Sequence, residues 1–261
     1  MKEAKPILEI QDLHVDVEGK TVIKGADITI FPGEVHAIMG KNGSGKTTLA
    51  NALIGHPRYI VTRGDILFKG ESVLTLPPEE RARKRIFLAF QNPTAVPGVT
   101  VAEFLRASLL AVRKDEIEPK KIRALIREEV KHFGVPETFL TRYLNDGFSG
   151  GEKKKLEMLQ MRLLKPELVV LDETDSGLDI DSLKRVSECI EEHRDGSRGI
   201  LIITHYQRLL EYVKPDRVHV FIDGKVIKSG GPELALELET HGYGWAERDN
   251  ENIEAERKQG V

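Results

Sequence analysis

A glycine-rich segment has the residue types needed to hold a polyphosphate. In GKNGSGKTT, four residues separate Gly40 from Gly45, which Lys46 and Thr47 follow. Glycines let successive backbone N–H groups converge on one anion, and a following helix adds its positive N-terminal end. Lys46 would place a charge at the outer phosphates, and the Thr47 hydroxyl suits Mg²⁺. A plain glycine turn leaves the Lys-Thr pair unexplained, so we predict a phosphate-binding loop. Its predicted nucleotide contacts are Gly40, Lys41, Asn42, Gly43, Ser44, Gly45, Lys46, Thr47 and Thr48.

Two adjacent carboxylates follow a predicted buried strand. In LVVLDE, four apolar residues bring Asp172 and Glu173 to the carboxyl end of the strand, the edge at which open parallel sheets bind ligands. Because successive strand side chains point to opposite faces, we expect Asp172 to address Mg²⁺ and Glu173 to address an attacking water. Without the phosphate-binding loop, a helix N-cap would be an equally good interpretation.

A second glycine-rich segment, NDGFSGGEKKKLEMLQ, begins a lysine-rich helix. Ser149 and Glu152 fit a capping box, in which each side chain satisfies a backbone donor at the helix start. That motif does not explain Gly150 and Gly151, each less favourable than alanine by about 0.8–1.0 kcal/mol in a helix interior. Exposed amides at a helix N-terminus bind anions, so we expect another group to approach this backbone closely.

A mixed α/β fold is needed to position these segments. The alternation over residues 7–30 predicts an antiparallel hairpin, and a second hairpin is predicted to turn at Asp223 and Gly224. Segment 46–55 has the apolar spacing of a helix. Short apolar runs predict buried parallel strands at 34–40, 85–90, 167–172 and 199–204.

We expect two subdomains and a tail. Residues 1–92 and 165–245 form the predicted nucleotide-binding α/β core. Residues 93–164 have a helical pattern throughout and predict an inserted helical subdomain. Residues 246–261 are nearly all polar and predict a solvated tail.

Composition argues against several classes of protein. The 261 residues carry a net charge of −3, so a nucleic-acid partner is not expected. No apolar run reaches the roughly 20 residues of a membrane span, and the first residues lack the apolar segment of a secretory signal. A cytoplasmic protein is therefore expected. The single cysteine, Cys189, permits no internal disulfide, cannot hold a metal cluster by itself, and is interpreted as a buried helix residue.

The order and spacing of six motifs resemble those of the ATP-binding cassette (ABC) ATPases over almost the whole chain. The motifs are the loop at 40–48, Gln91 in LAFQNP, FSGGE at 148–152, LVVLDE at 168–173, SGLD at 176–179 and His205 in IITH. The resemblance implies an α/β ABC ATPase fold: a P-loop parallel-sheet core, an N-terminal antiparallel β subdomain and an inserted helical subdomain. It also implies hydrolysis of ATP with Mg²⁺.

The same resemblance implies roles for individual residues. His205 is expected to contact the γ-phosphate, and Asp179 to communicate across a dimer. Ser149 and its two glycines are expected to contact the γ-phosphate held by a second, antiparallel copy of the chain. In isolation, Gln91 would be interpreted as a loop amide and His205 as a strand-end polar residue. The expected catalytic residues are Glu173, His205 and Gln91; the expected Mg²⁺ ligands are Thr47, Gln91 and Asp172; and the expected contacts to the partner's nucleotide are Ser149, Gly150 and Gly151.

Longer sequence stretches indicate one group within this family. GEVHAIMGKNGSGKTTL, LNDGFSGGEKKKLEMLQ and LDETDSGLDIDSLK are similar to the ATPase subunits of the Suf iron-sulfur cluster assembly system. This similarity implies an ATPase that drives conformational change in a soluble scaffold of two partner subunits (SufB/SufD-like), each binding one ATPase copy through its helical region. The alternative is the nucleotide-binding subunit of an ABC membrane transporter. A non-hydrolysing module is disfavoured because Glu173 and His205 are both present.

The chain departs from the family pattern at three positions. Phe148 and Glu152 replace the commoner leucine and glutamine of the signature motif, and Val17 falls where many members carry an adenine-stacking tyrosine. Because Val17 offers no aromatic face, we expect weak adenine selectivity and micromolar or poorer ATP affinity. The run Lys153–Lys155 is interpreted as a solvated helix face, with a contribution to the opposed site as the alternative.

Overall fold

Two β-sheets form the framework of the described chain, which comprises residues 5–205, 207–246 and 248 of a computed structural model. The antiparallel sheet has the order β2-β1-β4-β5, and the larger sheet has the order β12-β11-β3-β10-β9-β6, with only β12 antiparallel to its neighbour. The antiparallel sheet comprises β1 (Leu8–Val17), β2 (Lys20–Ile30), β4 (Tyr59–Phe68) and β5 (Glu71–Ser72). The larger sheet comprises β3 (Val35–Met39), β6 (Ile86–Ala89), β9 (Leu168–Asp172), β10 (Gly199–Thr204), β11 (Arg217–Ile222) and β12 (Lys225–Gly230).

The predicted parallel strands and both predicted hairpins are confirmed, but the antiparallel sheet extends further than the sequence predicted. Strand β4 pairs with β1 over most of its length. Its first half is largely exposed and only its last three residues include buried side chains. The segment therefore lacks the regular alternation that would have identified it.

Segment 93–164 is not helical throughout, contrary to the prediction. Strands β7 (Val96–Thr100) and β8 (Tyr143–Leu144) pair with each other before and after the helices. A two-residue strand has no detectable period, and β7 contains a proline and a glycine, so neither could be identified from the sequence. The helical elements here are α3 (Val101–Arg113), η1 (Pro119–Lys121), α4 (Ile122–His132), η2 (Glu137–Thr141) and α5 (Gly150–Leu164).

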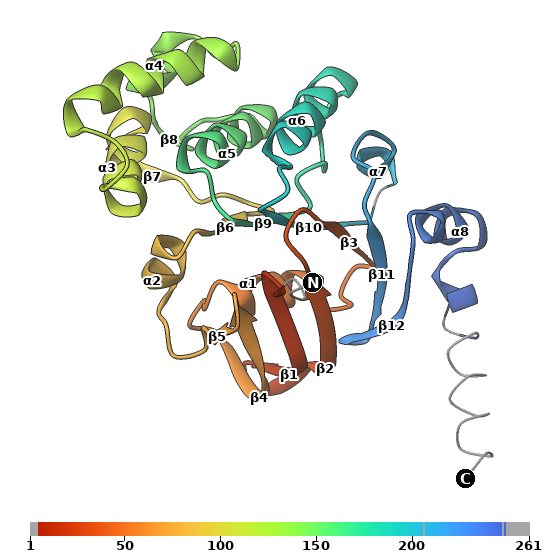
Figure 1. Cartoon of the computed structure of the whole chain (residues 1–261). Helices are drawn as coiled ribbons and strands as arrows, with labels where there is room; N and C mark the ends of the chain where they lie inside the picture. The colour runs from red at the N-terminus through yellow and green to blue at the C-terminus, as the bar shows by residue number, and fades with distance from the viewer. Residues whose placement is uncertain (1–4, 206, 247, 249–261) are drawn as a thin grey trace.

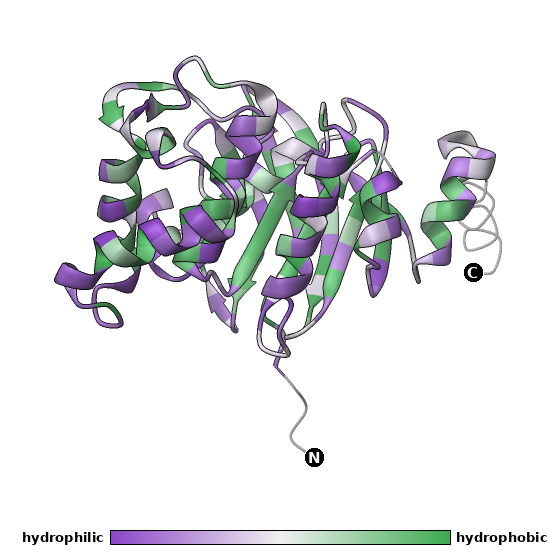
Figure 2. Ribbon diagram, turned by 90° about the horizontal axis from the view of Figure 1, so that it is seen from above, coloured by the Kyte–Doolittle hydropathy of each residue, from purple (hydrophilic) through white to green (hydrophobic). Residues whose placement is uncertain are grey.

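The larger sheet separates two hydrophobic cores. In β3, Val35, Ala37 and Met39 pack into the core that contains the buried residues of α3, α4 and α5, whereas Ile38 packs against the antiparallel sheet. Figure 1 shows the antiparallel sheet on one side of the larger sheet and α5 and α6 (Ile180–His193) on the other. In Figure 2 the central strands are largely hydrophobic (green), and the helices around them carry both hydrophilic (purple) and hydrophobic bands.

The remaining helices of the described chain are short. They are α1 (Lys46–Leu53), α2 (Pro78–Arg83), α7 (Arg208–Tyr212) and α8 (Glu233–His241). Ala246, assigned to the solvated tail, is buried against the core instead. The rest of that tail lies outside the described residues, except Arg248. No described helix is both long and apolar enough to cross a membrane.

A buried arginine caps the C-terminal end of α1. Arg81 of α2 is 4% exposed and donates hydrogen bonds to the carbonyl oxygens of Ala52 and Leu53, at 2.9 and 2.7 Å. A cation at this end complements the helix dipole and satisfies orphan carbonyls. Gly55 is needed beside it, because its φ is +75° and an added Cβ would lie 2.8 Å from the guanidinium.

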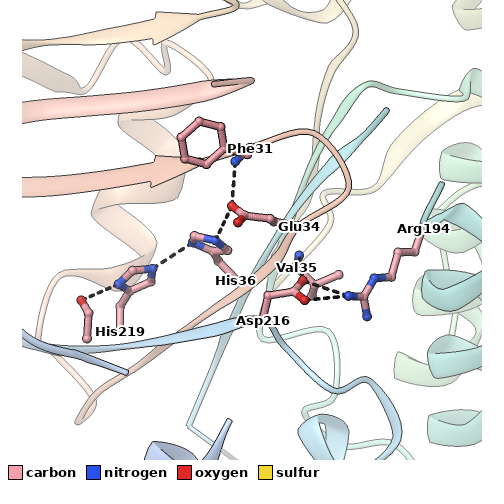
Figure 3. A network of polar contacts seen from close by, with 8 residues as sticks. Phe31, Glu34, Val35, His36, Arg194, Asp216 and His219 are labelled. Atoms are coloured by element: carbon pink, nitrogen blue, oxygen red, sulfur yellow. Dashed lines mark hydrogen bonds and ion pairs between the residues drawn. The ribbon is translucent and has the colours of Figure 1, made fainter. Parts of the chain in front are cut away.

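A buried polar chain joins β3 to β11 just before the phosphate-binding loop (Figure 3). His36 Nδ1 lies 3.0 Å from His219 Nε2, and His36 Nε2 lies 3.0 Å from Glu34 Oε2. His219 Nδ1 lies 2.8 Å from the Ser229 hydroxyl. Burial lowers the pKa of His36, and burial with the neighbouring His36 lowers the pKa of His219 to about 3. Both imidazoles are therefore neutral near pH 7.

Candidate nucleotide-hydrolysis site

The predicted phosphate-binding loop lies between β3 and α1 and has the backbone geometry of an anion cradle. Gly43 and Gly45 have φ of +81° and +105°, which L-residues with side chains rarely adopt. Gly40 is also required, because an added Cβ would lie 2.1 Å from the carbonyl oxygen of Phe221. The glycines thus allow both the turn and the close approach of a second chain segment.

The hairpin of β11 and β12 braces this loop. The amide of Gly224 donates a hydrogen bond of 2.9 Å to the carbonyl oxygen of Ser44. A Cβ on Gly224 would lie 1.9 Å from the carbonyl oxygen of Val22. The turn pair Asp223 and Gly224 was predicted, but its position under the phosphate-binding loop depends on tertiary packing that the sequence does not reveal.

Lys46 lies at the centre of the loop. Its ammonium group donates hydrogen bonds to the carbonyl oxygens of Gly40 at 2.7 Å and Lys41 at 3.0 Å. Burial lowers the pKa of Lys46, while the charges of Glu173 and Asp172 oppose that shift. Both predicted carboxylates are therefore near enough to act on the charge of the lysine.

The predicted Mg²⁺ ligands Thr47 and Asp172 lie together. The Thr47 hydroxyl donates to Asp172 Oδ1 over 3.4 Å. Burial raises the pKa of Asp172 to about 6, which the Thr47 hydrogen bond opposes and the charge of Glu173 reinforces. Mg²⁺ prefers oxygen ligands and completes its shell with waters and phosphates, so this pair fits the ion. The described residues include no group of three or more His, Cys, Asp or Glu side chains that could hold a metal.

The three predicted catalytic side chains converge. Gln91 Nε2 donates a hydrogen bond of 2.6 Å to Glu173 Oε2, and His205 Nδ1 lies 3.3 Å from Glu173 Oε1. Gln91 follows β6, Glu173 follows β9 and His205 follows β10, so the carboxyl ends of parallel strands bring them to one edge.

Glu173 reaches this position for a different reason from the one predicted. It lies beyond the end of β9, with φ +47°, so a left-handed backbone turn rather than strand alternation separates its side chain from Asp172. Its amide donates to the Ile203 carbonyl oxygen at 2.8 Å. A non-glycine residue in this conformation is strained and persists only where the surroundings hold it.

A cavity of about 250 Å³ lies beside the loop. Val22 supplies an apolar wall, whereas Val17, the predicted base contact, does not line it. Val22 was missed, although it lies in β2 beside the loop: its Cγ1 would be 3.3 Å from a Cβ added to Gly45. The lining residues are Val22, Asn42, Gly43, Gly45, Lys46, Thr47, Thr48, Gln91 and Glu173.

The predicted partner-facing segment forms the start of α5. Ser149 is the N-cap: the Glu152 amide donates to its hydroxyl at 3.3 Å, and the Ser149 amide donates to Glu152 Oε2 at 2.8 Å. An added Cβ at Gly150 or Gly151 would meet nothing within 4 Å. Their absence of side chains is therefore not required by packing within the described chain. None of these three predicted contacts lines the cavity beside the phosphate-binding loop.

The predicted solvated lysine face is wrong for Lys154, which is 5% exposed. Its ammonium donates to the Phe90 carbonyl oxygen and pairs with Glu157 Oε2 at 3.0 Å. Glu157 Oε1 in turn accepts from the Phe90 amide at 2.6 Å. Burial raises the pKa of Glu157 to about 7, against the charge of Lys154. The overlooked signal is the spacing of these residues. Lys154 and Glu157 are three residues apart on the helix, and Leu156 and Met158 beside them lie in the core.

Asp179 is the N-cap of α6, and Cys189 is a buried residue of the same helix. Asp179 caps the helix by accepting from the Ser182 amide at 2.7 Å, which lowers the pKa of its carboxyl. Cys189 is buried, as predicted, and burial raises the pKa of its thiol to about 12.

Comparisons with known proteins agree with this geometry. The family model described as ABC transporter matches residues 23–176. A protein of Pyropia yezoensis named probable ATP-dependent transporter ycf16 is 50% identical over 246 residues, which cover 93% of this chain and 98% of that protein. A protein of Escherichia coli (strain K12) named probable ATP-dependent transporter SufC is 50% identical over 243 residues, which cover 92% of this chain and 98% of that protein.

Solved structures share the fold. One described as the ATP binding subunit of an ABC transporter has a TM-score of 0.77 at 24% identity and covers 94% of this chain and 99% of that chain. A dimeric ATP-binding cassette in a post-hydrolysis state, bound to ADP and Pi, has a TM-score of 0.75 at 19% identity and covers 86% of this chain and 98% of that chain.

Proposed function

Because the chain belongs to the ABC family of ATPases, we propose that it binds and hydrolyses ATP to drive conformational change in a soluble scaffold that assembles iron-sulfur clusters. The observation that carries the hydrolytic part is the convergence of Gln91 and His205 on Glu173 beside the phosphate-binding loop. The observation that carries the cellular role is the extent of the similarity to the protein named SufC.

Each side chain has a distinct part in hydrolysis. Backbone amides of the loop and the Lys46 ammonium bind the phosphates, and His205 contacts the γ-phosphate. Glu173 accepts a proton from the attacking water, and Gln91 orients that water. Thr47 and Asp172, with Gln91, would hold Mg²⁺, which when bound would supply positive charge to the phosphate oxygens.

The second anion site completes this arrangement in a pair of chains. The open space around Gly150 and Gly151 and the exposed start of α5 support close approach by a phosphate held on another copy. Each copy then supplies half of each of two sites. ATP favours the closed pair and hydrolysis removes the γ-phosphate contacts, so turnover alternates the pair between two states.

The partner is a scaffold of SufB/SufD-like subunits that receives this motion. The only cysteine of the sequence, Cys189, is buried and its thiol has a pKa raised to about 12, so this chain is a poor ligand for a cluster. That chemistry fits an ATPase that acts on a cluster-bearing partner. A cytoplasmic location is part of the same proposal.

Co-purification tests the partner. The tagged full chain should retain soluble cysteine-bearing proteins after detergent-free lysis and clearing of membranes by ultracentrifugation. Recovery of integral membrane proteins in stoichiometric amounts, seen only after detergent extraction, would instead identify the nucleotide-binding subunit of an ABC transporter. A mock purification from cells without the tag controls for unspecific binding.

A further inference from the structure

Asp175 occupies a buried position that the hydrolysis site described above does not use. Its side chain is 8% exposed, and its Oδ2 atom accepts a hydrogen bond of 2.6 Å from the Thr204 hydroxyl. Thr204 is the fully buried last residue of β10 and immediately precedes His205. This bond therefore joins the segment that follows Glu173 to the strand that carries His205.

The bond compensates an otherwise unfavourable burial. Burial raises the pKa of Asp175, and the Thr204 hydrogen bond opposes the shift, as does the nearby His205. Within the described part of the chain, the other oxygen, Oδ1, is buried without a hydrogen-bond partner. A buried carboxylate is costly unless it is hydrogen-bonded, so the Thr204 hydroxyl is its principal side-chain support.

Of the two ends of this bond, the Thr204 end is the rigid one. Thr204 pairs with Met39 in the register of β10 against β3, at the centre of the larger sheet. No strand of the described residues pairs with segment 173–179, and Gly177 has φ +72°. The segment also borders a cavity of about 560 Å³, which is lined by Asp175, Gly177, Leu178 and residues of α6 and α7. The segment is thus attached to β10 and borders open space.

Glu173 requires such an attachment because its backbone is strained. Its left-handed φ of +47° is stabilised on one side by the bond from its amide to the Ile203 carbonyl oxygen. Two residues further, Asp175 attaches the same segment to Thr204. Strained conformations persist only where surrounding contacts over-determine them.

We propose that Asp175 is a positioning residue for hydrolysis: through Thr204 it holds the segment 173–179 on the end of β10 and so keeps Glu173 opposite His205. The inference rests on the proposed function, because it takes Glu173 as the proton acceptor. Loss of the bond should release Glu173 from its left-handed conformation without disturbing the phosphate-binding loop. ATP binding and ATP turnover should therefore respond differently.

The test compares substitutions at both ends of the bond in the full chain with its co-purified partners. Thr204→Val keeps the shape but removes the hydroxyl, and it should lower kcat roughly tenfold while the Kd for ATP stays within about twofold. Thr204→Ser keeps the hydroxyl and should retain wild-type kcat. Asp175→Ala should match Thr204→Val, and the double variant should be no worse than either single variant, because all three lack the same bond.

A spectroscopic measurement separates positioning from general destabilisation. The sequence has eight histidines, and the His205 imidazole signal in an NMR spectrum can be assigned with His205→Gln. In Thr204→Val that signal should shift while the signals of His36 and His219 stay in place. If Thr204→Val does not fold, Asp175→Asn, which keeps an acceptor oxygen, is compared with Asp175→Ala and should retain most of kcat.

Three results would overturn the inference: wild-type kcat in Thr204→Val, single-variant losses that multiply in the double variant, or an unmoved His205 signal. Glu173→Gln, assayed in parallel, distinguishes the two proposals. If that variant keeps wild-type turnover, the proposed function fails. If it loses turnover while Thr204→Val does not, only the role of Asp175 fails.

Discussion

Gln91 and Glu173, 82 residues apart in the chain, are joined by a hydrogen bond of 2.6 Å. The bond arises because β6 and β9 are adjacent parallel strands whose carboxyl ends meet. With His205 3.3 Å from the other carboxylate oxygen, Glu173 is held from both sides. An attacking water at this carboxylate would therefore share it with the Gln91 amide and the His205 imidazole.

Substitution Glu173→Gln should separate binding from chemistry. The amide keeps the size of the side chain but cannot accept the proton, so turnover should fall roughly 10²- to 10⁴-fold while ATP still binds. Paired chains should accumulate, which size-exclusion chromatography with Mg-ATP detects. A variant that stays monomeric and fully active contradicts both roles assigned to this residue.

Lys46→Ala should weaken ATP binding and turnover together, because it deletes a charge-assisted contact to the phosphates. A nucleotide titration with a parallel turnover assay measures both. Lys20→Ala, an exposed lysine of β2, is the matched control and should behave as wild type. Unchanged affinity in Lys46→Ala would mean that the loop does not bind phosphate.

Mixing Lys46→Ala with Ser149→Arg tests whether sites are shared between copies. In a mixed pair both lesions meet in one site and the other site is intact, so random pairing at equal amounts should restore about a quarter of wild-type sites. Turnover of the mixture against each inactive variant alone is the measurement, made at concentrations at which pairs form.

A single chain that carries both lesions provides the control for that experiment. Mixed with wild type, it breaks both sites of every mixed pair, so it should poison wild-type activity if sites are shared. A self-contained site in each chain predicts neither rescue in the first mixture nor poisoning in the second.

Lys154→Met should lower the free energy of unfolding by about 3–5 kcal/mol, because it leaves Glu157 buried without its ion-pair partner. Adding Glu157→Gln should recover much of that loss, since no buried charge then remains. Lys155→Met, a half-buried neighbour on the same helix, should cost far less. Urea unfolding measures all three, and equal losses at Lys154 and Lys155 would contradict the structural role of the pair.

The stability of the chain should depend on pH through His219. Folded His219 stays neutral to about pH 3, whereas the unfolded side chain takes up a proton below about pH 6.5. The unfolded state then binds more protons, so the free energy of unfolding falls as pH falls from 6.5, by about 1.4 kcal/mol per pH unit from this residue. His219→Gln should reduce the slope between pH 6 and 4 by that amount, and an unchanged slope would exclude this contribution.

The sequence predicted the elements whose signals are local. The glycine turn between a strand and a helix at residues 40–46, the buried parallel strands and the Ser149–Glu152 cap each depend on residue types within a few positions of one another, and the structure contains all three. The gathering of Gln91, Glu173 and His205 was expected only through the family resemblance. No pattern of neighbouring residues indicates that three strands end at the same edge of a sheet.

The features that the sequence could not predict depend on tertiary contacts. Lys154 is part of a surface-like lysine run, but the carbonyl oxygen and carboxylate that draw it inside belong to Phe90 and Glu157. Arg81 likewise has no partner in its own helix and acquires its role only from the end of α1. A positive φ at Glu173 is also invisible, because glutamate rarely adopts it.

The hydrogen bond from Gly224 to Ser44 can form only late in the synthesis of the chain. A ribosome makes the phosphate-binding loop early, yet the hairpin that braces it follows about 180 residues later, or roughly ten to forty seconds at usual rates of synthesis. Until then Gly40 and Ser44 lack their contacts with Phe221 and Gly224. The nascent chain therefore lacks one brace of this loop as the loop emerges, and a segment that is translated much later supplies it.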